Sequence, residues 1–410
     1  MKYVIIGAGA AGISAAKTLL DFDEKNQIVL ISEDEKAYSR CMLHFVIAGK
    51  RDIDTISFVD EKLFDSDRIS WISGKKVTEL IFVEREVVLE DKSHVSYDKL
   101  LIAAGANAVI PPIKGMEHSK NVFVLRNIGD ANAIREVASF AKRAVIIGAG
   151  LVGLDAASAL LSLGLEVTVV EMADRILSLQ LDSYSASQYQ RVMEDMGAVI
   201  YTGVSVVEVK QNRNGFVETV HLNNGAVLEC DLVVTAAGVR PNTIFIPDNS
   251  LEMNRGIQVN DCMQTSIPDV FAAGDVTGIT GIWPAATKQG KIAAYNMAGK
   301  DEHFDDYFSA KNAIHLFGIG TVAIGMPVAP DNSYVEAVWK NDAVYKKIIY
   351  KDGIVYGIIL QNDVSRSGFW TRVIKEKWKI NTSVKNIFDV TYADFFCINE
   401  EGEYTFRQQP

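Results

Sequence analysis

The sequence predicts an α/β protein with two Rossmann-like dinucleotide-binding folds and a C-terminal α+β domain. The first two folds are predicted because one pattern, strand then glycine-rich turn then helix then strand, occurs at residues 3–33 and again at 144–171. The third domain is predicted because alternating strands and aromatic residues become frequent after about Asp306. Within it we expect a hairpin turn at Asp352 and Gly353 and a helix near Trp370 to Trp378. We therefore expect three domains, the first discontinuous: 1–109 with 243–306, 110–242, and 307–410. Residues 69–101 alternate apolar and polar positions in short runs, which predicts strands added to the first domain.

The first copy of the pattern starts with the apolar run Tyr3–Ile6 and ends with the apolar run Ile28–Ile31. Three glycines at GxGxxG spacing follow the first run: Gly7, Gly9 and Gly12. The first two let the backbone turn and approach a pyrophosphate, and the third lets the helix pack closely on the strand. The helix N-terminus offers free N–H groups to the anion. Glu33 ends the second strand, where a carboxylate can accept hydrogen bonds from ribose hydroxyls.

The second copy repeats these features with Gly148, Gly150 and Gly153, followed by Glu171 after the second strand. Two dinucleotide folds imply two dinucleotides, and the chemistry that uses both is hydride transfer between a nicotinamide and a flavin. We expect the first fold to bind FAD and the second NADH. NADH is preferred over NADPH, because no basic residue lies between Glu171 and Arg175 to balance a 2′-phosphate.

Composition narrows the class of protein. Of 410 residues, 48% are hydrophobic and 23% are charged, which is typical of a globular protein. The net charge of −11 argues against nonspecific nucleic-acid binding, because a phosphate backbone would be repelled. Residues 1–10 enter a core strand directly, and no apolar run approaches the roughly 18 residues that span a bilayer. We therefore expect a cytoplasmic protein with no membrane partner.

The four cysteines are isolated in the sequence, with no CxxC or CxxxxC pair: Cys41, Cys230, Cys262 and Cys397. This spacing excludes the redox dithiol of disulfide oxidoreductases and any cage for iron–sulfur or zinc built from neighbouring cysteines. We therefore expect no metal site.

Three further segments carry a resemblance to a known family. The loop Ala37–Arg40 reads AYSR, the segment Leu100–Ala106 resembles an ATG element with Ala104 in place of threonine, and Thr265–Asp275 reads TSIPDVFAAGD. With the two nucleotide folds, these segments resemble the FAD/NAD(P)-dependent pyridine nucleotide-disulfide oxidoreductases. Within this family, the sequence most resembles the branch of NADH:rubredoxin reductases and nitrite-reductase flavin domains, which includes NADH oxidase-like proteins. The resemblance covers residues 1–378, and the tail from about Ile380 lies beyond it.

The resemblance and the glycine patterns together imply the cofactor contacts. Val77 matches the family position whose backbone contacts the adenine. Arg126 matches an arginine that contacts FAD across the domain boundary, and Asp275 matches an aspartate that binds the ribityl hydroxyls. The helix that starts at Trp283 would point its N–H groups at the flavin. The expected FAD-binding residues are Gly7, Gly9, Gly12, Glu33, Arg40, Val77, Gly105, Arg126, Gly274, Asp275 and Trp283. The expected NAD-binding residues are Gly148, Gly150, Gly153, Glu171 and Gly238. For Arg40, a solvated loop cation is the alternative.

Asp155 is a candidate catalytic residue by resemblance. The family often has a glutamate at this position, directed at the nicotinamide and the flavin edge, and sometimes a basic residue opposite it. In this sequence Phe45 stands where the basic residue is expected. The resemblance therefore implies a positioning role for Asp155 rather than proton transfer, with a plain aspartate on the helix surface as the alternative.

Cys41 is the second candidate. It precedes an expected helix from about Met42 to Ala48, where the helix dipole and Arg40 would lower the pKa of the thiol. Branches of the family that reduce peroxide, oxygen or coenzyme A disulfide carry one cysteine in a context echoed by Cys41, Phe45 and Ile47. A single-cysteine redox centre and a simple packing role both stay open.

Three functions follow. The first is an NADH-dependent FAD reductase that passes electrons to a small redox protein such as rubredoxin, and the family implies a homodimer. The second is a single-cysteine NADH oxidase, peroxidase or coenzyme A disulfide reductase that uses Cys41. The third is a flavoprotein subunit of a larger redox complex, which would use the C-terminal tail as its contact.

Overall fold

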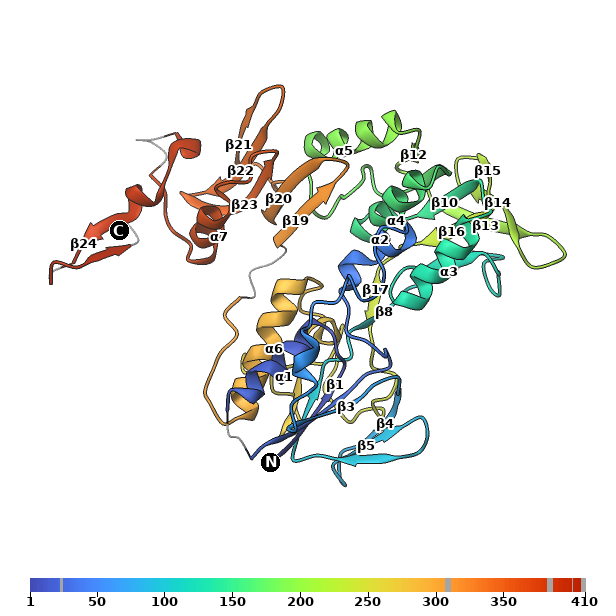
Figure 1. The fold of residues 1–410 in the computed structure, drawn as a ribbon. Coiled ribbons are helices and arrows are strands. Elements are labelled where there is room, and N and C mark those ends of the chain that lie inside the picture. Colours follow the sequence, from blue (N-terminus) through green and yellow to red (C-terminus); the bar gives the residue numbers. More distant parts are fainter. Residues whose placement is uncertain (23–24, 307–310, 382–385, 400, 407–410) are drawn as a thin grey trace.

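The structure is a computed structural model that describes residues 1–22, 25–306, 311–381, 386–399 and 401–406. It contains two parallel α/β sheets and a C-terminal antiparallel sheet, which form three lobes in Figure 1. The predicted fold class is confirmed. No helix in the described ranges is long and apolar enough to cross a membrane.

The first lobe is built on a five-stranded parallel sheet in the order β18-β7-β1-β2-β3. Its strands are β1 (Lys2–Ile6), β2 (Gln27–Ile31), β3 (Ile69–Ile72), β7 (Lys99–Ile102) and β18 (Val270–Ala272). Helices α1 (Ala10–Leu20) and α6 (Trp283–Met297) lie side by side on this sheet (Figure 1). They approach closely because Gly290 has no side chain: a Cβ there would lie 2.1 Å from the Ala11 carbonyl oxygen.

The segment 69–101, expected as strands added to the first domain, divides between two sheets. Strand β3 joins the parallel sheet. The next three strands form a separate antiparallel sheet: β4 (Val77–Ile81), β5 (Glu86–Leu89) and β6 (His94–Ser96). Burial alone does not separate the two sheets, because β5 of the antiparallel sheet is as buried as β7 of the parallel sheet; the division lies in the strand pairing.

The second lobe is a five-stranded parallel sheet in the order β12-β11-β10-β16-β9. Its strands are β9 (Val122–Val124), β10 (Arg143–Ile147), β11 (Glu166–Val170), β12 (Val199–Tyr201) and β16 (Leu232–Thr235), and its helices are α3 (Ile128–Ala138), α4 (Leu151–Ser162) and α5 (Ser183–Asp195). An antiparallel sheet of β13 (Val206–Gln211), β14 (Val217–Leu222) and β15 (Val227–Glu229) lies beside it. Its β14–β15 turn contains Gly225 at φ +89°, where glycine is favoured.

Two short strands connect the lobes. Strand β8 (Ala106–Ala108) leaves the first lobe, and β17 (Val239–Pro241) returns to it. They pair with each other in antiparallel fashion. The chain therefore crosses between the lobes as a two-stranded ribbon, which Figure 1 shows between the two parallel sheets.

The short helix α2 (Leu43–Ile47) follows a 3₁₀ turn over Arg40–Met42 and packs against α3 and α4 of the second lobe. Leu43, Val46 and Ile47 are buried in the same apolar cluster as Leu154 of α4. A helix from the N-terminal part of the sequence thus contributes to the core of the second lobe.

The C-terminal lobe is an antiparallel sheet in the order β19-β20-β23-β22-β21, covered by α7 (Ser367–Lys375). Its strands are β19 (Lys311–Leu316), β20 (Ile319–Gly325), β21 (Val335–Lys340), β22 (Tyr345–Lys351) and β23 (Ile354–Gln361). The expected turn at Asp352 and Gly353 joins β22 to β23, with both residues at positive φ. Helix α7 ends three residues before Trp378, which was expected inside it.

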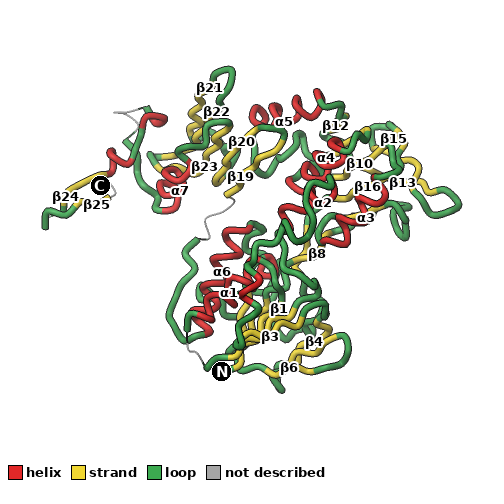
Figure 2. The backbone as a smooth tube through the Cα atoms, in the orientation of Figure 1, coloured by secondary structure: helices red, strands yellow, loops and turns green. Residues whose placement is uncertain are grey.

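The tail beyond residue 380 contains two 3₁₀ turns, Ile387–Asp389 and Tyr392–Phe395, and a small hairpin of β24 (Phe396–Ile398) and β25 (Tyr404–Phe406). The hairpin lies at the far end of the C-terminal lobe (Figure 2). Phe396, Ile398 and Tyr404 are 49%, 62% and 69% exposed. The tail therefore presents apolar side chains on its surface.

Candidate functional site

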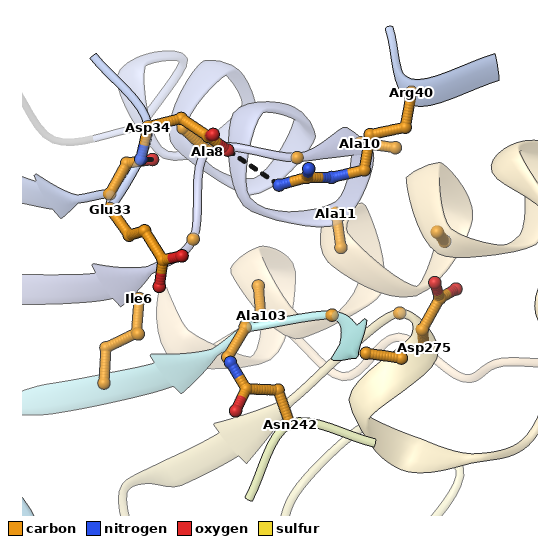
Figure 3. A pocket seen from close by; sticks show the side chains of 18 of the residues that line it. Ile6, Ala8, Ala10, Ala11, Glu33, Asp34, Arg40, Ala103, Asn242 and Asp275 are labelled. Carbon is orange, nitrogen blue, oxygen red and sulfur yellow. Dashed lines mark hydrogen bonds and ion pairs between the residues drawn. The ribbon is translucent and has the colours of Figure 1, made fainter. Parts of the chain in front are cut away.

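A pocket opens at the carboxyl ends of the strands of the first sheet, where open α/β sheets bind their ligands. Figure 3 shows it from close by. Nearly all of the residues expected to bind FAD line it: Gly7, Gly9, Glu33, Arg40, Val77, Gly105, Arg126, Gly274, Asp275 and Trp283. Cys41 lines it as well. Gly12, the remaining expected residue, lies beneath the glycine turn in the contact between α1 and β1.

The glycine turn has the shape that a pyrophosphate requires. A Cβ on Gly7 would lie 2.2 Å from the Ala103 carbonyl oxygen, and one on Gly12 would lie 1.8 Å from the Gly7 carbonyl oxygen. These two glycines therefore permit close backbone packing. A Cβ on Gly9 would meet nothing within 4 Å, and Gly9 borders the pocket. The turn leaves space for an anion in front of the N-terminus of α1, so these residues fit FAD.

Arg40 belongs to a hydrogen-bonded cluster with Asp34 and Tyr38. Its guanidinium donates to Asp34 Oδ2 at 2.7 Å and to the Arg126 carbonyl oxygen at 3.0 Å. The Tyr38 hydroxyl donates to Asp34 Oδ1 at 2.9 Å and accepts from the Ile128 N–H at 2.9 Å. The alternative of a solvated loop cation is therefore wrong, because Arg40 ties its loop to the start of α3. Glu33, next in sequence to Asp34, points away from Arg40 (Figure 3).

Arg126 crosses from the second lobe to the first. Its Nε donates to the Ala106 carbonyl oxygen at 2.8 Å, and its guanidinium forms a 2.8 Å ion pair with Asp275. Both side chains of the pair are about one fifth exposed, at 23% and 22%. Arg126 thus positions the carboxylate of Asp275 at the wall of the pocket, near Gly105.

The second glycine turn reproduces the first. A Cβ on Gly148 would lie 2.6 Å from the Ala236 carbonyl oxygen, one on Gly153 would lie 2.0 Å from the Gly148 carbonyl oxygen, and one on Gly150 would meet nothing within 4 Å. Gly238 lies on the crossing ribbon, where its carbonyl oxygen accepts from the Val109 N–H at 3.0 Å. The turn at Gly150 therefore leaves the same space for a diphosphate.

Glu171 reaches back to this turn. Its carboxylate accepts from the Ala149 N–H and from the Ala173 N–H, both at 2.7 Å. Arg175, the nearest basic residue along the chain, bonds instead to Asp174 at 2.7 Å and to the Leu181 carbonyl oxygen at 2.9 Å. A 2′-phosphate beside Glu171 would therefore meet its negative charge, and Arg175 is already committed elsewhere.

Asp155 faces a basic residue that the sequence did not predict. In α4, its Oδ1 lies 3.6 Å from Nδ1 of His44 in α2, whereas Phe45 was expected at the partner position. Burial raises the pKa of Asp155 to about 7 and, with the charges of Lys50 and Arg51, lowers the pKa of His44 to about 4. Asp155 is not a plain surface aspartate, since its side chain is only 25% exposed and burial raises its pKa.

The pKa shift of the Cys41 thiol is opposite to the one that the sequence predicted. Cys41 is a free thiol open to the pocket. The surrounding protein and the negative charges of Asp155 and Asp275 raise the pKa of this thiol, where a lowered pKa was predicted. The reason is that Arg40 is paired with Asp34, and that Cys41 lies within a short 3₁₀ turn rather than at the start of a long helix.

Four residues of the pocket region were missed by sequence reasoning: Asp34, Tyr38, His44 and Asn242. Asp34 precedes the recognised loop Ala37–Arg40 and Tyr38 lies within it, but nothing in the pattern distinguishes their polar atoms from solvated ones. Asn242 donates its backbone N–H to the Gly105 carbonyl oxygen at 3.0 Å, which only the pairing of distant segments reveals.

Comparison with known proteins agrees with this geometry. The profile of the pyridine nucleotide-disulphide oxidoreductase family matches residues 1–290. The chain is 33% identical to the NADH-dependent phenylglyoxylate dehydrogenase subunit epsilon of Aromatoleum evansii, over 91% of each chain. It is 33% identical to the NADH oxidase of Methanocaldococcus jannaschii, over 74% of this chain and 71% of that protein.

A third relative is the NADH-rubredoxin oxidoreductase of Clostridium acetobutylicum, 30% identical over 79% of this chain and 81% of that protein. The crystal structure of NADH:rubredoxin oxidoreductase from that organism superposes with a TM-score of 0.75 over 93% of this chain and 96% of that one, at 26% identity. Longer relatives also match, and the chain spans 48% and 45% of two nitrite reductases, from Bacillus subtilis and Escherichia coli.

Proposed function

The chain belongs to the pyridine nucleotide-disulphide oxidoreductase family, and from this premise we propose that it passes electrons from NADH through FAD to a small redox protein of the rubredoxin or ferredoxin class. That it is an FAD-dependent NADH:acceptor oxidoreductase follows from the family and its relatives. The acceptor, the individual cofactor contacts, a homodimeric state and the domain limits predicted above are part of the proposal.

When bound, FAD and NADH supply the hydride chemistry. The chain contributes binding and orientation. Gly9 and Gly150 leave space for the two diphosphates, Arg126 and Asp275 fix the wall of the first pocket, and the loop at Arg40 holds the two lobes together. Orientation of this kind is a large part of the catalytic contribution of a protein to such a reaction.

The observation that favours a protein acceptor is the setting of Cys41, a free thiol in a short 3₁₀ turn rather than at the N-terminus of a long helix, and the raised pKa of the thiol agrees with it. A redox cysteine reacts as the thiolate, so a low pKa is the usual mark of such a centre. Here burial and two carboxylates oppose ionisation, and Cys41 has no cysteine partner among the free thiols. Electrons that leave the flavin directly for a redox protein need no thiol.

The experiment is a screen of acceptors with NADH in the wild type and in Cys41→Ser. We expect reduction of rubredoxin or ferredoxin at the same rate in both proteins. If oxygen, peroxide or coenzyme A disulfide is the preferred acceptor and Cys41→Ser abolishes its reduction, the single-cysteine alternative is correct instead.

A second candidate is a flavoprotein subunit of a larger complex. It is favoured by the exposed apolar side chains of the tail hairpin β24–β25 and by similarity to a relative that is itself a subunit. Gel filtration of the purified chain, with acceptor activity measured in the eluted peak, distinguishes the two: full activity in the chain alone supports an autonomous enzyme.

A further inference from the structure

Three potential metal ligands of different chemical types meet on the surface of the first lobe, away from the FAD pocket: Asp261, Cys262 and His303. Nδ1 of His303 lies 2.9 Å from Oδ2 of Asp261 and 3.8 Å from Sγ of Cys262. One atom from each side chain lies within 4.8 Å of the other two. Within the described parts of the chain, this is the one such group of histidine, cysteine or acidic residues.

The two loops that carry these side chains are fixed to each other. The Phe304 N–H donates to the Asp261 carbonyl oxygen at 2.7 Å. Met263 and Phe304, the next residues along each loop, are buried in the same apolar cluster. Cys262 and His303 are therefore held near each other whenever the domain is folded, and little ordering would be needed for both to bind one ion.

The other ring nitrogen of His303 is also engaged. Nε2 of His303 lies 3.2 Å from Oδ1 of Asp301. A histidine that binds a metal through one ring nitrogen commonly donates the other N–H to a carboxylate, which fixes the tautomer and the ring orientation. Asp301 is placed to accept that N–H while Nδ1 faces Asp261 and Cys262.

We propose that Asp261, Cys262 and His303 bind one zinc ion through an oxygen, a sulfur and a nitrogen atom, with Asp301 orienting His303. Zinc takes these three donor types at about 2.0–2.3 Å in tetrahedral geometry, which places neighbouring donor atoms roughly 3–4 Å apart. The distances from Nδ1 of His303 to Oδ2 of Asp261 and to Sγ of Cys262, 2.9 Å and 3.8 Å, are close to that range. Three protein ligands leave the fourth position to water.

The expectation of no metal site rested on spacing along the sequence. That reasoning excludes only ligands that are neighbours in the chain. Here His303 comes from the segment that follows α6, and the other two ligands come from the loop before β18, so that folding alone brings them together.

The test uses the full-length, FAD-loaded protein, stripped of metal with a chelator and titrated with zinc chloride against a chromophoric competitor. We expect about one zinc per chain in the wild type. Cys262→Ser and His303→Ala should each weaken binding about tenfold or more, a loss of the size seen even for outer-shell partners of metal sites. His94→Ala is the matched control, because His94 forms a 2.6 Å pair with a carboxylate, Glu86, on the same lobe and is not part of the Asp261, Cys262 and His303 group.

A second readout uses the wild type alone, so that a variant that fails to fold leaves the proposal testable. Zinc should slow the alkylation of Cys262 by iodoacetamide, measured by peptide mass, without slowing that of Cys397, whose Sγ contacts Thr405 instead. Wild-type protein that binds no zinc, zinc affinity in Cys262→Ser and His303→Ala equal to that of the wild type, or unchanged alkylation of Cys262 would each overturn the proposal.

Discussion

Oδ1 of Asp155 lies 3.6 Å from Nδ1 of His44, across the contact between α4 and α2. Burial acts on the two groups in opposite directions, because it disfavours the charged form of each. It raises the pKa of Asp155 to about 7 and is the largest cause that lowers the pKa of His44 to about 4. Between these values both side chains are neutral in the folded protein.

This pair predicts pH effects on stability that oppose each other. Between about pH 4 and 7, folded Asp155 holds a proton that an unfolded aspartate has released, so its contribution to stability falls as the pH rises. Folded His44 has lost a proton that an unfolded histidine holds below about pH 6.5, so its contribution rises with pH. In the wild type the two slopes largely cancel.

Substitution of either residue alone should make the pH dependence of stability that the other contributes measurable. In Asp155→Asn the free energy of unfolding should rise from pH 4 to 6.5, and in His44→Gln it should fall from pH 4 to 7. A shift of two to three pKa units corresponds to about 3 kcal/mol. Urea denaturation at several pH values measures both, with His315→Gln as a control at a histidine of the third lobe. Parallel pH profiles in the two variants would contradict the interpretation.

Replacement by alanine should have different effects at Gly9 and at Gly12, two glycines of the first turn. Gly9→Ala adds a methyl group to open space beside the pocket, so the protein should fold but bind FAD at least about tenfold more weakly, or about 1.4 kcal/mol. Gly12→Ala places its Cβ against the Gly7 carbonyl oxygen and should destabilise the fold itself, by about 1–3 kcal/mol. FAD titration and thermal denaturation of both variants separate the two effects. Equal thermal stability of the two variants would show that the packing argument is wrong.

Removal of the Arg126 guanidinium should weaken FAD binding. In Arg126→Leu, Asp275 loses the ion pair that positions its carboxylate at the pocket wall, and hydrogen bonds of charged groups contribute about 1.5–3 kcal/mol. FAD binding, followed by quenching of flavin fluorescence, should weaken about tenfold or more.

Arg85→Leu is the control, since Arg85 pairs with Asp269 at 3.0 Å on the same lobe, outside the pocket lining. Exposed pairs of this kind contribute little, so FAD affinity should stay unchanged. Similar losses in both variants would point to general damage to the first lobe rather than to the role of Arg126.

Local pattern was enough to predict most of the fold. Both glycine turns, the helix from Trp283 to Met297 and the turn at Asp352 and Gly353 were predicted, because their geometry depends on residues that are neighbours in the chain. In the pocket lining, the glycines of the first turn were expected from local pattern, whereas Arg40, Val77, Arg126 and Asp275 were expected from the family resemblance.

What the sequence could not predict depends on contacts between distant segments. Phe45 was placed opposite Asp155 by its position in the family resemblance, but the structure places His44 there. Which side chain of α2 faces Asp155 depends on how α2 packs against α4, a contact between distant segments. The pairing of Arg40 with Asp34 was missed for a related reason, because any loop arginine has several acidic residues within reach.

Glu171 predicts the choice of coenzyme. Its carboxylate is held in place by the N–H groups of Ala149 and Ala173, where it is available to ribose hydroxyls and repels a 2′-phosphate. Glu171→Ala should lower kcat/KM for NADH about tenfold, the effect of about 1.4 kcal/mol of lost hydrogen bonding. The value for NADPH should fall less, because the repulsion is removed at the same time. Glu166→Ala, at the exposed start of β11, the strand that Glu171 follows, should change neither value. If Glu171→Ala lowers kcat/KM for NADH and for NADPH by the same factor, the carboxylate stabilises the turn rather than selecting the coenzyme.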